Sequence, residues 1–294
     1  ALDIAGWSED LTEAVLASLV PNIADGSRRE ESNSWRRPID LVLLLERAYE
    51  RLPAAAAQGR DRRGSWSAGE ELARTLTGDD PEANTEALLQ ALLAGASPQD
   101  IGGAVVLAAA SRVAAFHLSN EFGDWDTVHH TFTYANGVHM GLRRLAQATE
   151  EAQLELLRGA FDAAMSVYLD RFLNVPATPL PKPAGAAKPE DLLPLLDQRQ
   201  QVNEAAEVVA SCLAAGGERL PALLAKAILR EDRDFHTIQN MEAALSQYRL
   251  QGSPVFLIAA ARYLAAHSAT PRAQAQTYTI ALRLHHGERL FEDS

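Results

Sequence analysis

The sequence predicts an all-α protein, a multi-helix array that resembles a bundle. Apolar residues make up 47% of the chain but aromatic residues only 6%. Alanine and leucine dominate the apolar residues, and this composition favours packed helices over β-sheet. Residues typical of helix starts and helix ends bound the long apolar stretches. Every element that we expect is therefore helical.

The length and the net charge of the chain limit which classes of protein it can belong to. A chain of 294 residues is long enough for one large helical domain or for two that share an interface. The formal charge of −12 argues against a nucleic-acid partner or an anionic membrane surface, which need a basic face. No apolar run approaches the ~20 residues of a membrane span, and no signal peptide is visible. We therefore expect a cytoplasmic protein with a small-molecule substrate.

The lone cysteine, Cys212, excludes a disulfide or a thiolate metal cage within this chain. It lies in an apolar helical run, which favours a buried, inert thiol over a nucleophile. Because the chain begins with Ala1 rather than methionine, we expect it to be processed, trimmed or cut from a longer protein.

The first part of the chain divides into helices at recognisable caps and breakers. We expect a helix over 11–20 closed by Pro21 and Gly26, a charged loop at 28–37, a helix after Pro38, a helix begun by the capping box of Ser67 and Glu70, and a helix from Pro81 to Gly95.

The clearest helix start is Ser97-Pro98-Gln99-Asp100, which combines a cap, a proline at the first position and an acid three residues after the cap. The helix that follows, about 97–117, is apolar on nearly every face. We expect this helix and a second apolar helix, 254–267, to be among the most buried elements. The first of them ends at His117, and a helix from about Asp124 carries the chain onward.

A proline-rich segment divides the chain. Six of the fourteen prolines lie between Asn174 and Pro194, which is typical of an extended connector. We expect an N-terminal helical half at 1–175, a connector at 176–194 and a C-terminal helical half at 195–294 that packs on the first. Helices are expected at about 190–215, 219–250, 254–267 and 270–287. A faint internal repeat relates 92–117 to 213–236, and it would make His117 and His236 equivalent.

The stretch 116–143 is rich in ionisable side chains although its flanks are apolar, and it holds four of the eight histidines. Buried imidazoles and carboxylates cost free energy unless they are paired or bind a metal. Histidines at the ends of apolar helices therefore predict a metal site. The candidate ligands are His117, His130, His139, His236 and His267.

Two aspartates precede histidines by four residues: Asp126 before His130, and Asp232 before His236. On a helix this spacing puts both side chains on one face, where a carboxylate can orient a metal-bound imidazole. The alternative is a pair of ordinary surface Asp–His contacts. His129 faces about 100° away from His130, and we expect it to lie off this metal. His139 faces about 180° away, so it would share the metal only if the helix bends near 136–137.

The remaining histidines have simpler interpretations. His267 closes the helix 254–267 with Tyr263 one turn earlier, and a plain helix-end histidine is the alternative there. His285 and His286 are expected at an exposed helix end. Imidazoles without thiolates suit iron, zinc, manganese or copper. A site closed to water by apolar helices would suit O2 chemistry at Fe(II).

The segments DTVHHTFTYANGVH (126–139) and DFHTIQNMEAALSQY (234–248) resemble the two histidine blocks of the questin oxidase-like family. Those proteins are helical oxygenases that act on aromatic polyketides with a histidine-bound non-haem iron. SNEFGDWDTVHHTFTYANGVH and REDRDFHTIQ are also similar to helical segments found beside Rieske [2Fe–2S] domains in some actinobacterial proteins. The resemblance implies an iron site in which His130 and His236 are ligands, followed by His117, His139 and His267.

The sequence thus predicts a non-haem iron oxygenase acting on an aromatic or similar small substrate. Asp126, Tyr134 and Asp232 are the expected catalytic side chains, and a Rieske-type protein is a possible electron donor. Zinc in the same histidine cage would give a hydrolase instead. A non-catalytic helical interaction module, with histidines that only cap helices, is the alternative from a different class. No nucleotide-binding loop or serine-hydrolase motif occurs.

Overall fold

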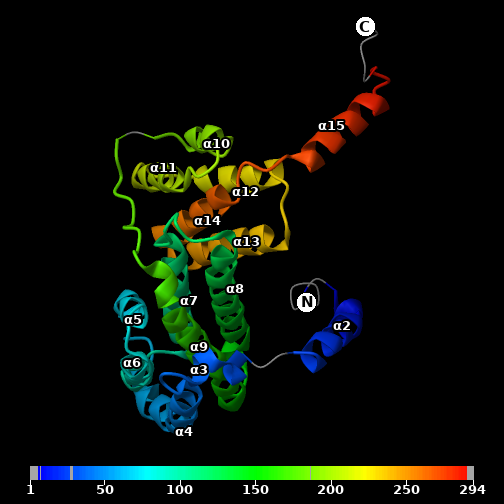
Figure 1. Cartoon of the computed structure of the whole chain (residues 1–294). Helices are drawn as coiled ribbons and strands as arrows, with labels where there is room; N and C mark the ends of the chain where they lie inside the picture. Colours follow the sequence, from blue (N-terminus) through cyan, green and yellow to red (C-terminus); the bar gives the residue numbers. More distant parts are fainter. Residues whose placement is uncertain (1–5, 7, 27–28, 186, 290–294) are drawn as a thin grey trace. The chain divides into compact units, whose positions relative to one another are not determined.

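The computed structural model describes residue 6 and residues 8–26, 29–185 and 187–289 (Figure 1). These residues form α-helices and short 3-10 helices, and they contain no strand. The all-α prediction is confirmed. None of the helices described is both long enough and apolar enough to cross a membrane.

The chain forms two compact units, residues 1–44 and 45–294. In the first unit, α2 (Thr12–Ala24) buries none of its residues. The predicted helix end at Pro21 is wrong, because α2 continues to Ala24 and ends where the Asp25 N–H donates to the Pro21 carbonyl (2.9 Å). A proline removes one helical donor but leaves its own carbonyl free to accept. The charged segment 28–37 is no simple loop, since Asn33–Arg36 forms α3.

The second unit is an array of helices. They are α4 (Leu41–Gly59, which begins in the first unit), α5 (Gly69–Leu76), α6 (Pro81–Leu93), α7 (Pro98–Ala114), α8 (Phe122–Arg144), α9 (Glu150–Leu169), α10 (Leu192–Leu195), α11 (Val202–Ala214), α12 (Leu220–Arg230), α13 (Phe235–Gln251), α14 (Pro254–Ala266) and α15 (Ala273–His285).

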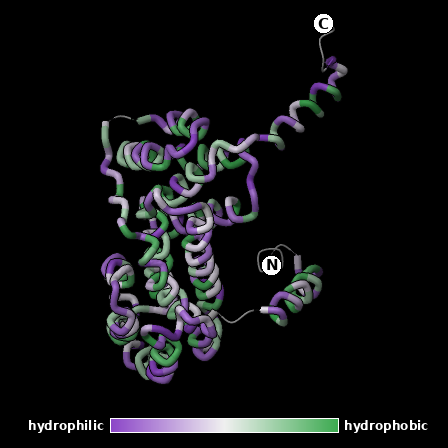
Figure 2. The backbone as a smooth tube through the Cα atoms, in the orientation of Figure 1, coloured by the Kyte–Doolittle hydropathy of each residue, from purple (hydrophilic) through white to green (hydrophobic). Residues whose placement is uncertain are grey.

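The core of this unit lies around α7 and α14. The α7 helix packs against α5, α8, α9 and α14, whereas α14 packs against α7, α11 and α13. Nearly every residue of both helices is buried, as their apolar sequences predict. In contrast, α15 buries none of its residues, and polar and apolar residues alternate along it in Figure 2. Both sides of the proline-rich segment lie within the second unit, and the division at 176–194 stays a prediction.

Local capping predictions succeed at α7 and fail at α5. The Ser97 Oγ accepts from the Asp100 N–H (3.1 Å), and Asp100 Oδ2 accepts from the Ser97 N–H (2.8 Å), so the expected helix start is confirmed and forms a capping box. The predicted box of Ser67 and Glu70 is wrong. The α5 helix begins at Gly69, with Ala68 at the cap position, so Ser67 lies outside it.

The single helix expected over 219–250 is two helices. The α12 helix ends at Arg230, and α13 begins at Phe235. Asp234 caps α13 by accepting from the Thr237 N–H (2.8 Å), which is the role that short acidic side chains favour over a helix interior. Four residues of non-helical backbone therefore separate the two helices, and an acidic cluster lies within them.

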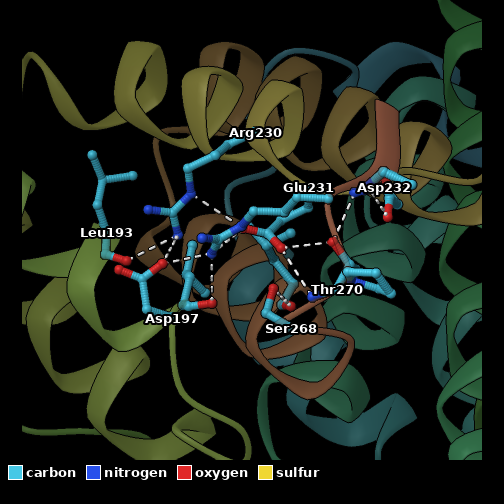
Figure 3. Close-up of polar contacts among 12 residues, drawn as sticks. Leu193, Asp197, Arg230, Glu231, Asp232, Ser268 and Thr270 are labelled. Carbon is cyan, nitrogen blue, oxygen red and sulfur yellow. Dashed lines mark hydrogen bonds and ion pairs between the residues drawn. The ribbon is translucent and has the colours of Figure 1, made fainter. Parts of the chain in front are cut away.

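The buried carboxylate of Glu231 ties three loops together (Figure 3). Glu231 is only 2% exposed, and it accepts hydrogen bonds from Arg272 Nε (3.0 Å) and Thr270 Oγ1 (2.8 Å). Arg272 also donates to Asp197 (2.6 Å), and Arg230 donates to Glu231 (3.1 Å). Burial alone would raise the pKa of Glu231, but the bonds from Arg272 and Thr270 outweigh it and lower the pKa.

We expect Glu231→Gln to lower the free energy of unfolding by about 2–3 kcal/mol, because it removes one partner of a buried ion pair. Urea denaturation measures this change. The exposed Glu207→Gln serves as the matched control and should change the stability by less than about 0.5 kcal/mol. Equal midpoints for the two variants would show that the network in Figure 3 does not stabilise the fold.

Candidate functional site

Packing of α8 against α13 brings together two histidines from distant parts of the chain. The Nε2 atoms of His130 and His236 are 3.2 Å apart, and their ring centroids are 4.9 Å apart. These are the two residues that the sequence favours most as ligands. The expected closure to water does not extend to them, because His130 is exposed and His236 is half-buried.

His129 lies beside this pair and is fully buried. Its ring centroid is 5.4 Å from that of His130 and 5.3 Å from that of His236. Its Nδ1 lies 3.3 Å from Asn240 Nδ2, whereas its Nε2 has no hydrogen-bond partner among the residues described. A buried polar nitrogen without a partner costs about 1–3 kcal/mol, and a bound water or ion at this atom would offset that cost.

Burial first, and then the neighbouring imidazoles of His130 and His236, lower the pKa of His129 to about 4. His129 is therefore neutral at pH 7. The sequence alone places His129 off the metal, because adjacent helical positions face different directions. In the folded chain, however, the His236 ring contacts the rings of both His129 and His130. The only local signal was the His-His pair itself, next to apolar positions.

A second group of polar residues lies next to His129. The Tyr263 hydroxyl donates to Asp126 Oδ1 (2.9 Å), and the Tyr263 ring stacks on that of His267 with centroids 4.1 Å apart. His267 Nδ1 lies 2.7 Å from the Tyr263 carbonyl, so this nitrogen carries the proton. Burial and then the bond to Asp126 raise the pKa of Tyr263, which keeps the phenol neutral. Asp126 thus orients a tyrosine, and its carboxylate lies 3.9 Å from His267 Nε2.

His117 and His139 lie in other surroundings. His117 is in the turn after α7, where its Nδ1 accepts from the Ser119 N–H (3.1 Å). His139 is buried, and its Nδ1 lies 3.0 Å from Gln247 Oε1. It is on the same helix as His130, about 13 Å farther along by the helical rise. The α8 helix is unbroken through 136–137, and His139 and His130 have different partners.

Two expected catalytic residues also lie elsewhere. The prediction that Asp232 shares a helix face with His236 is wrong, because Asp232 precedes α13. Its carboxylate instead caps α15 by accepting from the Gln274 and Ala273 N–H groups (2.9 Å each), and these bonds lower its pKa. Tyr134 is exposed on α8, and its hydroxyl lies over Gly159 of α9.

The histidine nitrogens of His129, His130 and His236 meet some, but not all, of the requirements of a metal site. Within the described part of the chain, no three or more histidine, cysteine or acidic side chains are placed so that they could hold a metal as they stand. However, two nitrogens that bind one metal at about 2.1 Å are roughly 3.0–3.4 Å apart when they occupy adjacent coordination positions. The 3.2 Å between His130 and His236 has this value, which a hydrogen bond between the two rings also explains.

Comparisons with protein-family models, curated proteins and solved structures found no match to this chain. The fold and the site define an all-helical protein with three histidines in ring contact, contributed by α8 and α13. A fourth, His267 at the end of α14, stacks on Tyr263, whose ring lies beside that of His129.

We expect the free energy of unfolding to fall as the pH falls from 6.5 toward 5. Burial lowers the pKa of both His129 and His139 to about 4, so in this window the unfolded chain binds more protons than the folded chain. Each such histidine contributes a slope of ~1.4 kcal/mol per pH unit below its ordinary pKa. Urea denaturation at several pH values measures the slope.

His139→Gln should reduce this slope, whereas His285→Gln, at the exposed end of α15, should leave it unchanged. A wild-type stability that does not vary between pH 6.5 and pH 5 would contradict the burial of two neutral imidazoles.

Proposed function

We propose that this protein is a metal-dependent oxidoreductase whose Fe(II) is held by His130 and His236, with His129 as a third nitrogen ligand. The observation that carries the proposal is the 3.2 Å between the two Nε2 atoms, on helices far apart in sequence, beside the buried Nε2 of His129 that lacks a hydrogen-bond partner. Binding a metal would satisfy that nitrogen, whereas a hydrogen bond between His130 and His236 leaves it without a partner.

The protonation states of the cluster support this proposal. His129 is neutral above about pH 4 because its pKa is lowered by burial, and the neutral form has the lone pair that a metal needs. The Asn240 amide lies at Nδ1 of His129 (3.3 Å). The two ends of an amide are almost the same size, so rotating it presents Oδ1 to an Nδ1 proton. Nε2 would then face the cluster with its lone pair free.

All-nitrogen ligation suits a redox-active iron, which would supply the O2 chemistry of an oxygenase. The surrounding residues suit an aromatic substrate. Phe235 is 69% exposed and Ile238 is 49% exposed, and both lie on α13 within two residues of His236. Their apolar side chains would form a rim around the exposed His130 side. Asp126, which accepts the Tyr263 hydroxyl proton, would hold the phenol ring in place next to His129.

Anaerobic titration with Fe(II), and separately with Zn(II), tests the metal site by calorimetry. We expect one ion to bind per chain, and His130→Ala and His236→Ala each to weaken binding at least tenfold. The double variant His285→Ala/His286→Ala is the matched control, because it removes two exposed imidazoles at the end of α15 and should leave this binding unchanged. Saturation at 100 times the Kd should stabilise the fold by about 2.7 kcal/mol.

Equal binding by wild-type protein and both single variants would contradict the site. In that case the histidines would have a structural role, as expected of a helical interaction module.

A second measurement tests the reaction. Fe(II)-loaded protein mixed with O2 and a hydroxylated aromatic compound should consume O2 faster than the same mixture with His236→Ala. An oxygen electrode measures the rate, and Zn(II)-loaded protein is the control for redox chemistry. Metal binding at His130 and His236 without any iron-dependent O2 uptake would retain the metal site and reject the oxygenase. Hydrolysis by the zinc form would then become the better account.

A further inference from the structure

A cavity of about 350 Å³ opens beside α7, at the other end of α8 from the His130–His236 pair. Its wall comes from the start of α5, from α7, from α8 and from the end of α13. Its charged and polar lining includes Glu70, Asp100, His139 and Arg143. Neither the proposed metal ligands nor the proposed oxidation uses this cavity.

The hydrogen-bond network around His139 determines which ring nitrogen carries its proton. Gln251 Nε2 donates to the Gly103 carbonyl (3.2 Å), and a backbone carbonyl only accepts, so the orientation of this amide is determined. The same nitrogen donates to Gln247 Oε1 (2.9 Å), which identifies that atom as the oxygen. His139 Nδ1, 3.0 Å from this oxygen, must therefore donate to it. Burial lowers the pKa of His139 to about 4, so Nε2 is an unprotonated acceptor.

The Nε2 edge of His139 faces Gly103, which lines the same cavity. A Cβ added at Gly103 would lie 3.7 Å from both Nε2 and Cε1 of His139, which is ordinary van der Waals contact. The absence of a side chain at Gly103 therefore leaves this edge of a 97%-buried ring open to the cavity, and alanine would cover it without a clash. His139 is 3% exposed.

A second cavity, of about 640 Å³, adjoins the first, because Glu70, Leu107 and Ser253 line both. Its exposed wall is mainly apolar and includes Leu180. Arg112 is the buried cation in that wall, and it is engaged because it donates to two backbone carbonyls (2.8 and 3.1 Å). The two cavities together form a polar chamber that continues into an apolar one.

We propose that these cavities bind a free α-amino acid with an apolar side chain. The ammonium group donates to Nε2 of His139 and lies near the carboxylates of Glu70 and Asp100. The carboxylate pairs with the guanidinium of Arg143 at the rim. The apolar side chain enters the second chamber past Leu107. Arg143 is the cation in the wall of the first cavity, whereas Arg74 and Arg112 line the second. The acceptors, Arg143 and the apolar wall of the second cavity each match one part of such a ligand.

Calorimetric titration with L-phenylalanine tests the site. Phenethylamine, which lacks the carboxylate, and 3-phenylpropionate, which lacks the ammonium, are the comparison ligands. We expect L-phenylalanine to bind at least tenfold more tightly than either. Arg143→Gln should weaken L-phenylalanine at least tenfold but leave phenethylamine unchanged. Equal affinity for all three ligands, or no binding of any, would overturn the proposal.

Gly103→Ala should weaken L-phenylalanine binding at least tenfold without lowering the melting temperature, because the new methyl group covers Nε2 of His139. Gly137→Ala is the matched control. It places the same substitution within a helix, at a position with nothing within 4 Å of the added Cβ. Nitrogen-15 NMR should show His139 protonated at Nδ1, and its Nε2 signal should move when L-phenylalanine is added. Unchanged binding by Gly103→Ala, or a proton at Nε2, would also overturn the proposal.

Discussion

The register of α13 against α8 depends on a row of buried polar contacts between these two helices. His129 meets Asn240 (3.3 Å), Asn136 accepts from Gln247 (2.8 Å), and His139 donates to Gln247 (3.0 Å). All five side chains are buried. Each unpaired group would cost about 1–3 kcal/mol, so a shifted register, which breaks all three contacts at once, is strongly disfavoured.

This constraint determines where the chemistry lies. With α13 held in this register, His236 lies opposite His130 and against the ring of His129. At the other end of the row, Gln247 fixes the proton on Nδ1 of His139. Close approach of α8 to α7 is equally necessary. A Cβ at Gly102 would lie 3.2 Å from the His139 Cα, so a side chain there would make α7 and α8 move apart by a few tenths of an ångström.

Local patterns in the sequence were sufficient for the two central apolar helices and for part of the site. The cap at Ser97 and the apolar character of α7 and α14 depend on neighbouring residues, and these predictions are confirmed. The metal role of His130 and His236 was inferred from spacing and resemblance, and the structure places these two residues together.

Partner choice could not be predicted from spacing. Asp232 has the helical spacing to His236, but the chain leaves the helix at Glu231, so its carboxylate caps α15 instead. His129 was set aside because of its direction on an isolated helix, although the tertiary packing places it against His236. Asn240 and Gln247 carry no local signal at all. Their roles exist only once α13 lies against α8.

Anomalous diffraction tests the central claim most directly. Crystals grown with Fe(II) under anaerobic conditions, and measured on both sides of the iron absorption edge, locate the metal without assumptions about its ligands. The account predicts one peak, about 2.1 Å from the Nε2 atoms of His130 and His236, with the His129 ring turned toward it. An iron peak elsewhere, such as at His285 and His286, or no peak in iron-saturated crystals, would contradict it.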